Sequence, residues 1–141
     1  MESVREIIII PCSGIGKPTG TVGRAATYEV VEKLRPANSK TLCLALLVKG
    51  DKEALNMVHQ HPCITIDGCP LECARKNVEL AGGRLACGMK VTDVYKDHKE
   101  LKPETVLDIG EPGRKLARLL AEMVAREVDD IIAKRGAEKN G

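Results

Sequence analysis

Six cysteines are the residues of this 141-residue sequence whose type most directly suggests chemistry. They are Cys12, Cys43, Cys63, Cys69, Cys73 and Cys87. The N-terminal segment lacks the features of a secretory signal peptide, so we expect a cytoplasmic protein with reduced thiols. Reduced cysteines are either small core residues, or they bind metal ions or react as nucleophiles. The elements that position them decide between these roles.

Short apolar runs alternate with amphipathic segments along the chain. Strands are expected over 5–11, 41–48, 62–67 and 85–92, with a short edge strand or an extended connector at 106–109. Helices are expected over 21–34, 52–60 and 70–80 and from about 112 to 134. Residues 93–102 are expected to form a loop, with one turn of helix as the alternative. This alternation is typical of parallel strands joined by right-handed crossovers. We therefore predict an α/β three-layer sandwich with a mainly parallel four- or five-stranded sheet and a long C-terminal helix.

The C-terminal helix carries the clearest periodicity in the sequence. Its apolar residues recur every three or four positions, which favours a buried face. They are Leu116, Leu119, Leu120, Met123, Val124, Val128, Ile131 and Ile132. We interpret the stripe as a contact with the sheet, and a homodimer face is the alternative. One domain is expected over 1–135, followed by a disordered tail at 136–141.

Three cysteines are predicted to meet at one edge of the sheet. Cys12 follows the first strand and Cys69 follows the third, both at carboxyl ends. Cys73 comes four residues after Cys69, one helical turn on, and so shares its face. In open parallel sheets, sites form beyond the carboxyl ends of the strands. Cys12, Cys69 and Cys73 are therefore the primary candidate ligands.

The other three cysteines are placed less favourably. Cys63 begins the third strand, which puts it ~20 Å from the carboxyl edge. Cys87 lies early in the fourth strand, and both are interpreted as core residues. The position of Cys43 is ambiguous. It is buried in the middle of its strand if the strand ends at Val48, and it reaches the carboxyl edge of the sheet if the strand ends near Ala45.

A thiol at a helix N-terminus should have a lowered pKa, because free N–H groups and the helix dipole favour negative charge. Pro70 suits a first helical position, so Cys69 is expected at or just before such a terminus. The thiolate is both a metal ligand and a nucleophile. Three or four thiolates suit tetrahedral zinc, with Zn–S near ~2.3 Å, and also suit an iron–sulfur cluster.

The segment 12–18 lies between a strand and a helix, as in phosphatase loops and Walker A motifs. Pro18 occupies the position where a phosphatase loop needs an arginine, and a Walker A loop needs Ser or Thr there. Lys17 supplies a positive charge but not the planar, bidentate hydrogen-bonding group of an arginine. A backbone nest that binds an anion or orients sulfur ligands stays open, with Ser13 and Gly14 as candidate contacts.

Two aspartates complete the candidate site. Asp67 and Asp93 both end predicted strands at the carboxyl edge. Either carboxylate could bond a bound ligand or cap a turn, and capping is favoured.

Composition excludes several functions. There are 22 Lys and Arg against 20 Asp and Glu, and no concentrated basic face stands out, so no nucleic-acid partner is expected. The chain has no Phe, no Trp and 2 Tyr, so it has almost no aromatic side chains that could stack on nucleic-acid bases or on a flavin. No apolar run approaches the ~20 residues of a membrane span, so no membrane partner is expected.

Several short motifs together resemble the DGC domain family, named for an Asp-Gly-Cys triplet. They are Pro11-Cys12-Ser13-Gly14, Cys43-Leu44-Ala45, Ile66-Asp67-Gly68-Cys69-Pro70 with Cys73-Ala74, and Val91-Thr92-Asp93. The resemblance spans roughly residues 6–95. Because the family is described as zinc-binding, it implies that Cys12, Cys43, Cys69 and Cys73 belong to a metal site. It assigns no activity.

The sequence therefore favours a non-enzymatic zinc-binding protein that senses metal, delivers it to an unidentified protein partner or has an accessory role. Two alternatives stay open. In one, a thiol-redox or persulfide-transfer enzyme uses Cys69 to attack and Cys73 to resolve. In the other, the cysteines hold an iron–sulfur cluster.

Overall fold

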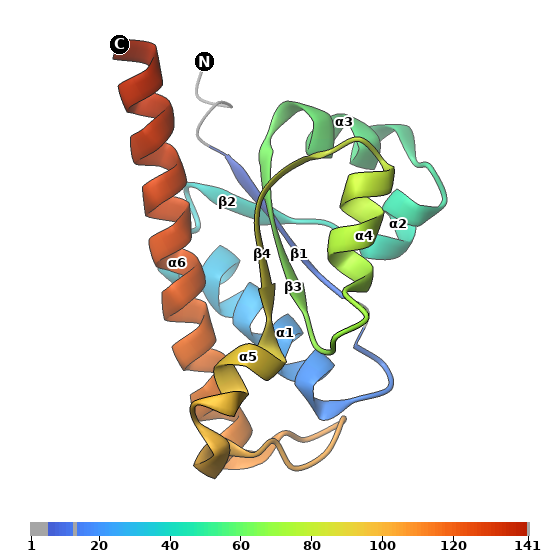
Figure 1. The fold of residues 1–141 in the computed structure, drawn as a ribbon, viewed down its shortest axis with the longest axis vertical. Helices are drawn as coiled ribbons and strands as arrows, with labels where there is room; N and C mark the ends of the chain where they lie inside the picture. The colour runs from blue at the N-terminus through green and yellow to red at the C-terminus, as the bar shows by residue number, and fades with distance from the viewer. Residues whose placement is uncertain (1–5, 13, 141) are drawn as a thin grey trace.

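A four-stranded parallel sheet lies between two layers of helices, which confirms the predicted α/β three-layer sandwich (Figure 1). The computed structural model describes residues 6–12 and 14–140. Its elements, in chain order, are β1 (Ile7–Pro11), α1 (Pro18–Glu29), the π-helical turn η2 (Val30–Leu34), β2 (Ser39–Thr41), α2 (Leu44–Val48), α3 (Lys52–Gln60), β3 (Pro62–Asp67), α4 (Cys73–Leu80), β4 (Arg84–Lys90), α5 (Val91–Lys96), the 3-10 turn η3 (Lys99–Leu101) and α6 (Gly110–Asn140).

The central strand β1 is apolar throughout because both of its faces are covered. Ile7 and Ile9 pack into a core with residues of α1 and α6, and Ile8 and Ile10 pack into a second core with residues of α2, α3 and α4. All four isoleucines are 0% exposed. A strand covered on both faces carries a continuous apolar run rather than alternating polar residues.

The strand order β2-β1-β3-β4 creates a switch point beside β1. From β1 the chain crosses by α1 to β2 at the sheet edge, then returns by α2 and α3 to β3 on the other side of β1. Crossover connections therefore leave β1 and β3 in opposite directions. The carboxyl ends of these two strands are level, since Pro11 pairs with Ile66. Crevices at such points are the usual binding sites of doubly wound sheets.

The second predicted strand, 41–48, is wrong over most of its length. β2 ends at Thr41, and the apolar residues after Cys43 form the short helix α2. Leu47 of α2 is buried in the second core, so these residues bury apolar surface as a helix. A short apolar run fits a buried strand and a buried helix equally well by pattern alone.

After β3, the structure corrects the expectation for residues 91–96 and decides between the two possibilities for 106–109. Strand β4 ends at Lys90, and residues 91–96 form α5 where strand and loop were expected. The segment 106–109 is a connector, one of the two expected possibilities, and its Ile109 carbonyl accepts from the Glu104 N–H at 2.9 Å. Asp93 therefore lies in the first turn of α5 rather than at a strand end.

The stripe on α6 packs into the core, as expected. Leu116, Leu120, Val124 and Val128 are 0% exposed and share a core with Ile7 and Ile9. Met123, counted in the same stripe, is 36% exposed and lies outside that core.

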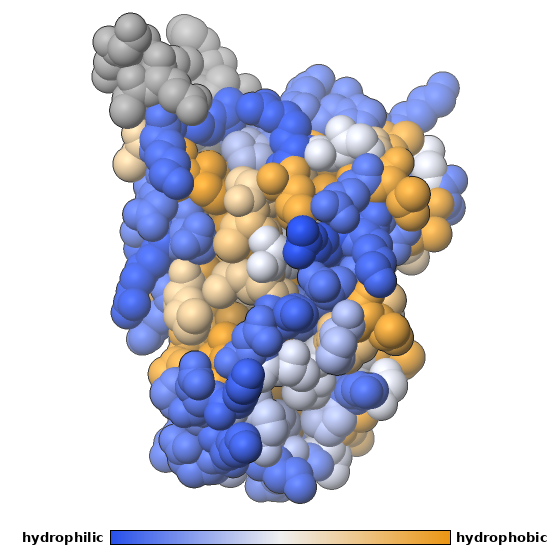
Figure 2. Space-filling model, in the orientation of Figure 1, coloured by the Kyte–Doolittle hydropathy of each residue, from blue (hydrophilic) through white to orange (hydrophobic). Residues whose placement is uncertain are grey.

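Strand β4 forms the outer edge of the sheet, and alternate residues along it are exposed. Figure 2 shows the result as a pale apolar band beside the charged outer surface of α6. Among the described residues, no helix combines the length and apolar character needed to cross a membrane.

A bidentate ion pair joins α6 to the turn that follows η2. The Arg35 guanidinium donates to both carboxylate oxygens of Asp129, at 2.8 Å from Nε and 2.6 Å from Nη2. This pair lowers the pKa of Asp129 below its ordinary value of 3.8. The Asp129 side chain is 51% exposed, so solvent screens the interaction.

We expect Asp129→Asn to lower the free energy of unfolding by ~0.5–1 kcal/mol at pH 7. Because folding lowers this pKa, the contribution is complete above pH 3.8 and is lost as the pH falls through the folded-state value. Urea titrations followed by circular dichroism at pH 7 and pH 3 measure it. A difference between wild type and variant that stays constant with pH would contradict this assignment.

Candidate functional site

Cys12 sits where the carboxyl ends of β1 and β3 meet. Its backbone N–H donates to the carbonyl of Ile66 at 3.0 Å, which extends the pairing of the two strands by one residue. Its Sγ in turn accepts a hydrogen bond from the backbone N–H of Gly68 at 3.3 Å. The thiol of the first loop is thereby fixed against the Asp-Gly-Cys segment of the second.

Cys12, Cys69 and Cys73 line one hollow of about 190 Å³. Cys12 and Cys69 are half-buried and Cys73 is exposed. The rest of the lining consists of Gly14, Ile15, Gly16, Lys17, Gly20 and Gly68. The sequence-based grouping of these three cysteines at one edge of the sheet therefore corresponds to a shared surface.

Three glycines, Gly14, Gly20 and Gly68, line the same hollow as these cysteines and pack closely against one another. A Cβ on Gly14 would come within 2.7 Å of the Gly20 backbone, and one on Gly68 within 2.6 Å. Side chains do not fit at such distances. Gly14 also has φ +64°, the left-handed region that glycine adopts most readily. The close approach holds the first loop, α1 and the Asp-Gly-Cys segment together.

Asp67 caps the helix that carries Cys73. Its carboxylate is 2% exposed and accepts from the backbone N–H groups of Ala74, at 2.7 Å, and Arg75, at 3.1 Å. Both oxygens are thus used on the start of α4, as the capping interpretation expected. Burial is the main cause that raises the pKa of Asp67, and the two N–H donors oppose it.

Because Asp67 caps the N–H groups of Ala74 and Arg75, the helix begins at Cys73 and not at the predicted residue 70. Glu72, just before it, adopts the left-handed conformation with φ 53°, which separates the Cys69 turn from the helix. The expectation that Cys69 sits at the helix N-terminus is therefore wrong. Cys73 occupies the first helical position instead.

The Cys12 thiol lies in surroundings that favour its neutral form. Burial is the largest cause that raises its pKa, and the carboxylate of Asp67 and the thiol of Cys69 add to it. The N–H groups of Gly68 and Gly14 act in the opposite direction without cancelling the effect. A positive charge close to this thiol would favour its ionised form.

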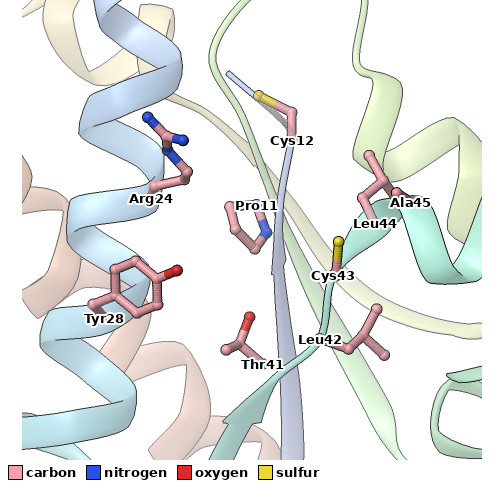
Figure 3. Close-up of a pocket in the computed structure, with 9 residues that line it drawn as sticks. All are labelled: Pro11, Cys12, Arg24, Tyr28, Thr41, Leu42, Cys43, Leu44 and Ala45. Atoms are coloured by element: carbon pink, nitrogen blue, oxygen red, sulfur yellow. The ribbon is translucent and has the colours of Figure 1, made fainter. Parts of the chain in front are cut away.

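The other candidates lie elsewhere. Cys43 is exposed and lines a neighbouring hollow that also reaches Cys12 (Figure 3). Asp93 is exposed on α5 and lines neither hollow. Gly14 belongs to the cysteine-lined hollow, and Ser13 lies outside the described residues.

Cys63 is a core cysteine, as predicted, and Cys87 is half-buried against the core. Cys63 is 0% exposed, and burial raises its pKa to about 12. Cys87 packs against the core between the sheet and α6, where burial and the nearby Glu127 raise its pKa. Neither lines the hollow that Cys12 shares with Cys69 and Cys73.

The thiols are suited to a soft metal by chemistry, but they are not preassembled. Within residues 6–12 and 14–135, no three Cys, His, Asp or Glu side chains are arranged to hold a metal ion together. The cysteines share a hollow without converging on a point. Binding would require movement of side chains, for which the exposed Cys73 and the turn at Cys69 leave room.

These features define a doubly wound α/β protein with a cysteine-lined hollow at its switch point. A family model of the DGC domain matches residues 8–111, well over half of the chain. The protein therefore belongs to the DGC domain family. Comparison with curated proteins gave no match, and neither did comparison with solved structures.

Sequence reasoning identified Gly14 as a candidate contact but missed Gly20 and Gly68. Gly20 lies inside a predicted connecting segment, and Gly68 follows a predicted strand. Their spacing from Gly14 along the chain gives no signal, because the three meet by tertiary packing.

Gly20→Ala should lower the free energy of unfolding by about 1–3 kcal/mol, because its Cβ would collide with the Gly14 backbone. Helix propensity alone would favour alanine at this position of α1 and would raise the free energy of unfolding. A decrease in that free energy therefore indicates that the packing clash dominates. The matched control is Gly16→Ala, where a Cβ meets nothing within 4 Å. Chemical denaturation of both variants measures the effect, and equal stabilities would refute the role of Gly20.

Alkylation should rank the cysteines by their surroundings. At pH 8, iodoacetamide is expected to modify Cys43 and Cys73 first, since both are exposed. Cys63 should stay unmodified in the folded protein, because it is buried and its pKa is about 12. Peptide mass spectrometry over time gives the order, with urea-unfolded protein as the control. Early modification of Cys63 in folded protein would show that its strand opens readily.

Proposed function

We propose that this protein binds a zinc ion reversibly through Cys12, Cys69 and Cys73. The observation that carries the proposal is that these three thiols, from two separate loops, line a single hollow at the switch point of the sheet. Thiolates are preferred zinc ligands, and three of them leave one position of a tetrahedral ion open. When bound, the metal would supply a positive charge that stabilises the thiolates and would cross-link the two loops.

Cys43 or an external ligand completes the coordination in this proposal. Cys43 lines the adjoining hollow, and Cys12 belongs to both hollows. A replaceable fourth ligand suits a protein that senses zinc or passes it to a partner, because ligand exchange then needs no unfolding. The exposure of Cys73 supports access by such a partner.

Metal analysis of untagged protein, purified anaerobically and then incubated with zinc, tests the proposal. We expect about one zinc ion per chain, and a several-fold weaker affinity in Cys12→Ser, Cys69→Ser and Cys73→Ser. Cys87→Ser is the matched control, because that thiol lies outside the hollow. Competition with a chromogenic chelator gives the affinities.

Three results would contradict the zinc proposal. The first is less than about a tenth of an equivalent of bound metal, unchanged by Cys69→Ser. The second is iron with equimolar inorganic sulfide, which identifies a cluster. The third is a metal-free protein in which a small disulfide oxidises Cys69 and Cys73 to a disulfide and is itself reduced to two thiols, which identifies dithiol chemistry.

A further inference from the structure

A second hollow lies on the other side of Cys12 and is not explained by the cysteine cluster. It has a volume of about 410 Å³ and opens between α1, the end of β1 and the segment that joins β2 to α2 (Figure 3). Its lining residues are Pro11, Cys12, Arg24, Tyr28, Thr41, Leu42, Cys43, Leu44 and Ala45.

One wall of this hollow carries hydrogen-bond donors. Arg24 and Tyr28 are four residues apart on α1 and so present their side chains on one face. Thr41, the last residue of β2, lies across from Tyr28, and the two hydroxyl groups point into the space between them (Figure 3). Within the described part of the chain, none of these three side chains makes a hydrogen bond or ion pair, and no acidic residue lines the hollow. The guanidinium charge is therefore available to a ligand.

The remaining walls are apolar, and the volume is that of an organic molecule. Pro11, Leu42, Leu44 and Ala45 contribute carbon surface. A hollow of about 410 Å³ falls in the range that accommodates small organic ligands, whereas a water molecule occupies roughly 30 Å³ of liquid. A bare inorganic ion would leave most of this space and its apolar walls without contact.

We propose that this hollow binds a small organic carboxylate, with the anionic group at Arg24, Tyr28 and Thr41 and a short apolar body against Leu42 and Leu44. The guanidinium fork matches a planar carboxylate with two parallel hydrogen bonds. The same fork also matches a phosphate, so the apolar walls, and not the guanidinium, favour an organic anion over inorganic phosphate. Cys43 lies beside Leu42 and Leu44 in the lining (Figure 3). Arg24, Tyr28 and Thr41 are not among the proposed zinc ligands, so the carboxylate proposal does not rest on zinc binding.

Paired alkylating reagents test this site, because Cys43 lines this hollow and Cys73 lines the other one. With either reagent, the sulfur forms a bond to the methylene carbon and iodide leaves with the bonding electrons. We expect the rate ratio of iodoacetate to iodoacetamide to be on the order of tenfold higher at Cys43 than at Cys73. Peptide mass spectrometry measures both cysteines in one sample, before and after chelation of any metal.

Two variants and a control localise the effect. Arg24→Gln should abolish the preference for iodoacetate at Cys43 and leave the ratio at Cys73 unchanged. Tyr28→Phe, which removes one hydroxyl group, should reduce the preference several-fold. Lys33→Gln is the matched control, since that cation is exposed and outside the hollow. Circular dichroism verifies that each variant is folded.

Competition with a second carboxylate distinguishes binding in the hollow from long-range electrostatic attraction of iodoacetate to the protein. Butyrate should slow the alkylation of Cys43 by both reagents in a saturable manner and spare Cys73, whereas butyramide should have no effect. Equal ratios at Cys43 and Cys73, or a ratio at Cys43 that survives Arg24→Gln, would overturn the proposal. Protection by inorganic phosphate as strong as that by butyrate would overturn the assignment to carboxylates.

Discussion

Contact between the backbones of Gly14, Gly20 and Gly68 is the constraint on which the candidate site depends. These glycines come from the loop after β1, the first turn of α1 and the loop after β3, and none has room for a Cβ. Their approach brings the Cys12 loop within hydrogen-bonding distance of the Asp-Gly-Cys segment. A larger side chain at any of the three would separate the loops, and with them the thiols.

Asp67 adds the second constraint, because it links the end of β3 to the start of α4. By accepting from Ala74 and Arg75, the buried carboxylate fixes where the helix begins and therefore where Cys73 projects. Asp67 therefore positions Cys73, and Gly68, which donates its N–H to the Cys12 sulfur, joins the two loops.

Cys12 connects two hollows of different character. One is lined by sulfur and glycine backbone, and the other by a guanidinium, two hydroxyl groups and apolar side chains. Burial disfavours the Cys12 thiolate, so the chemistry of this residue depends on what occupies the space on either side. A cation on one side and an anionic ligand on the other would have opposite effects on its charge.

Periodicity and chain order determined the layered α/β fold, the buried face of α6 and the grouping of Cys12 with Cys69 and Cys73. These follow from local patterns and from the rule that parallel strands share a carboxyl edge. The pattern could not separate strand from helix at residues 44–48, because a short apolar run is compatible with either. Tertiary structure alone decided the start of α4, the glycine contacts and the placement of Arg24 and Thr41 in the lining of one hollow. Each of these joins residues that are distant in sequence or depends on a side chain from another element, and neither relation leaves a local signal.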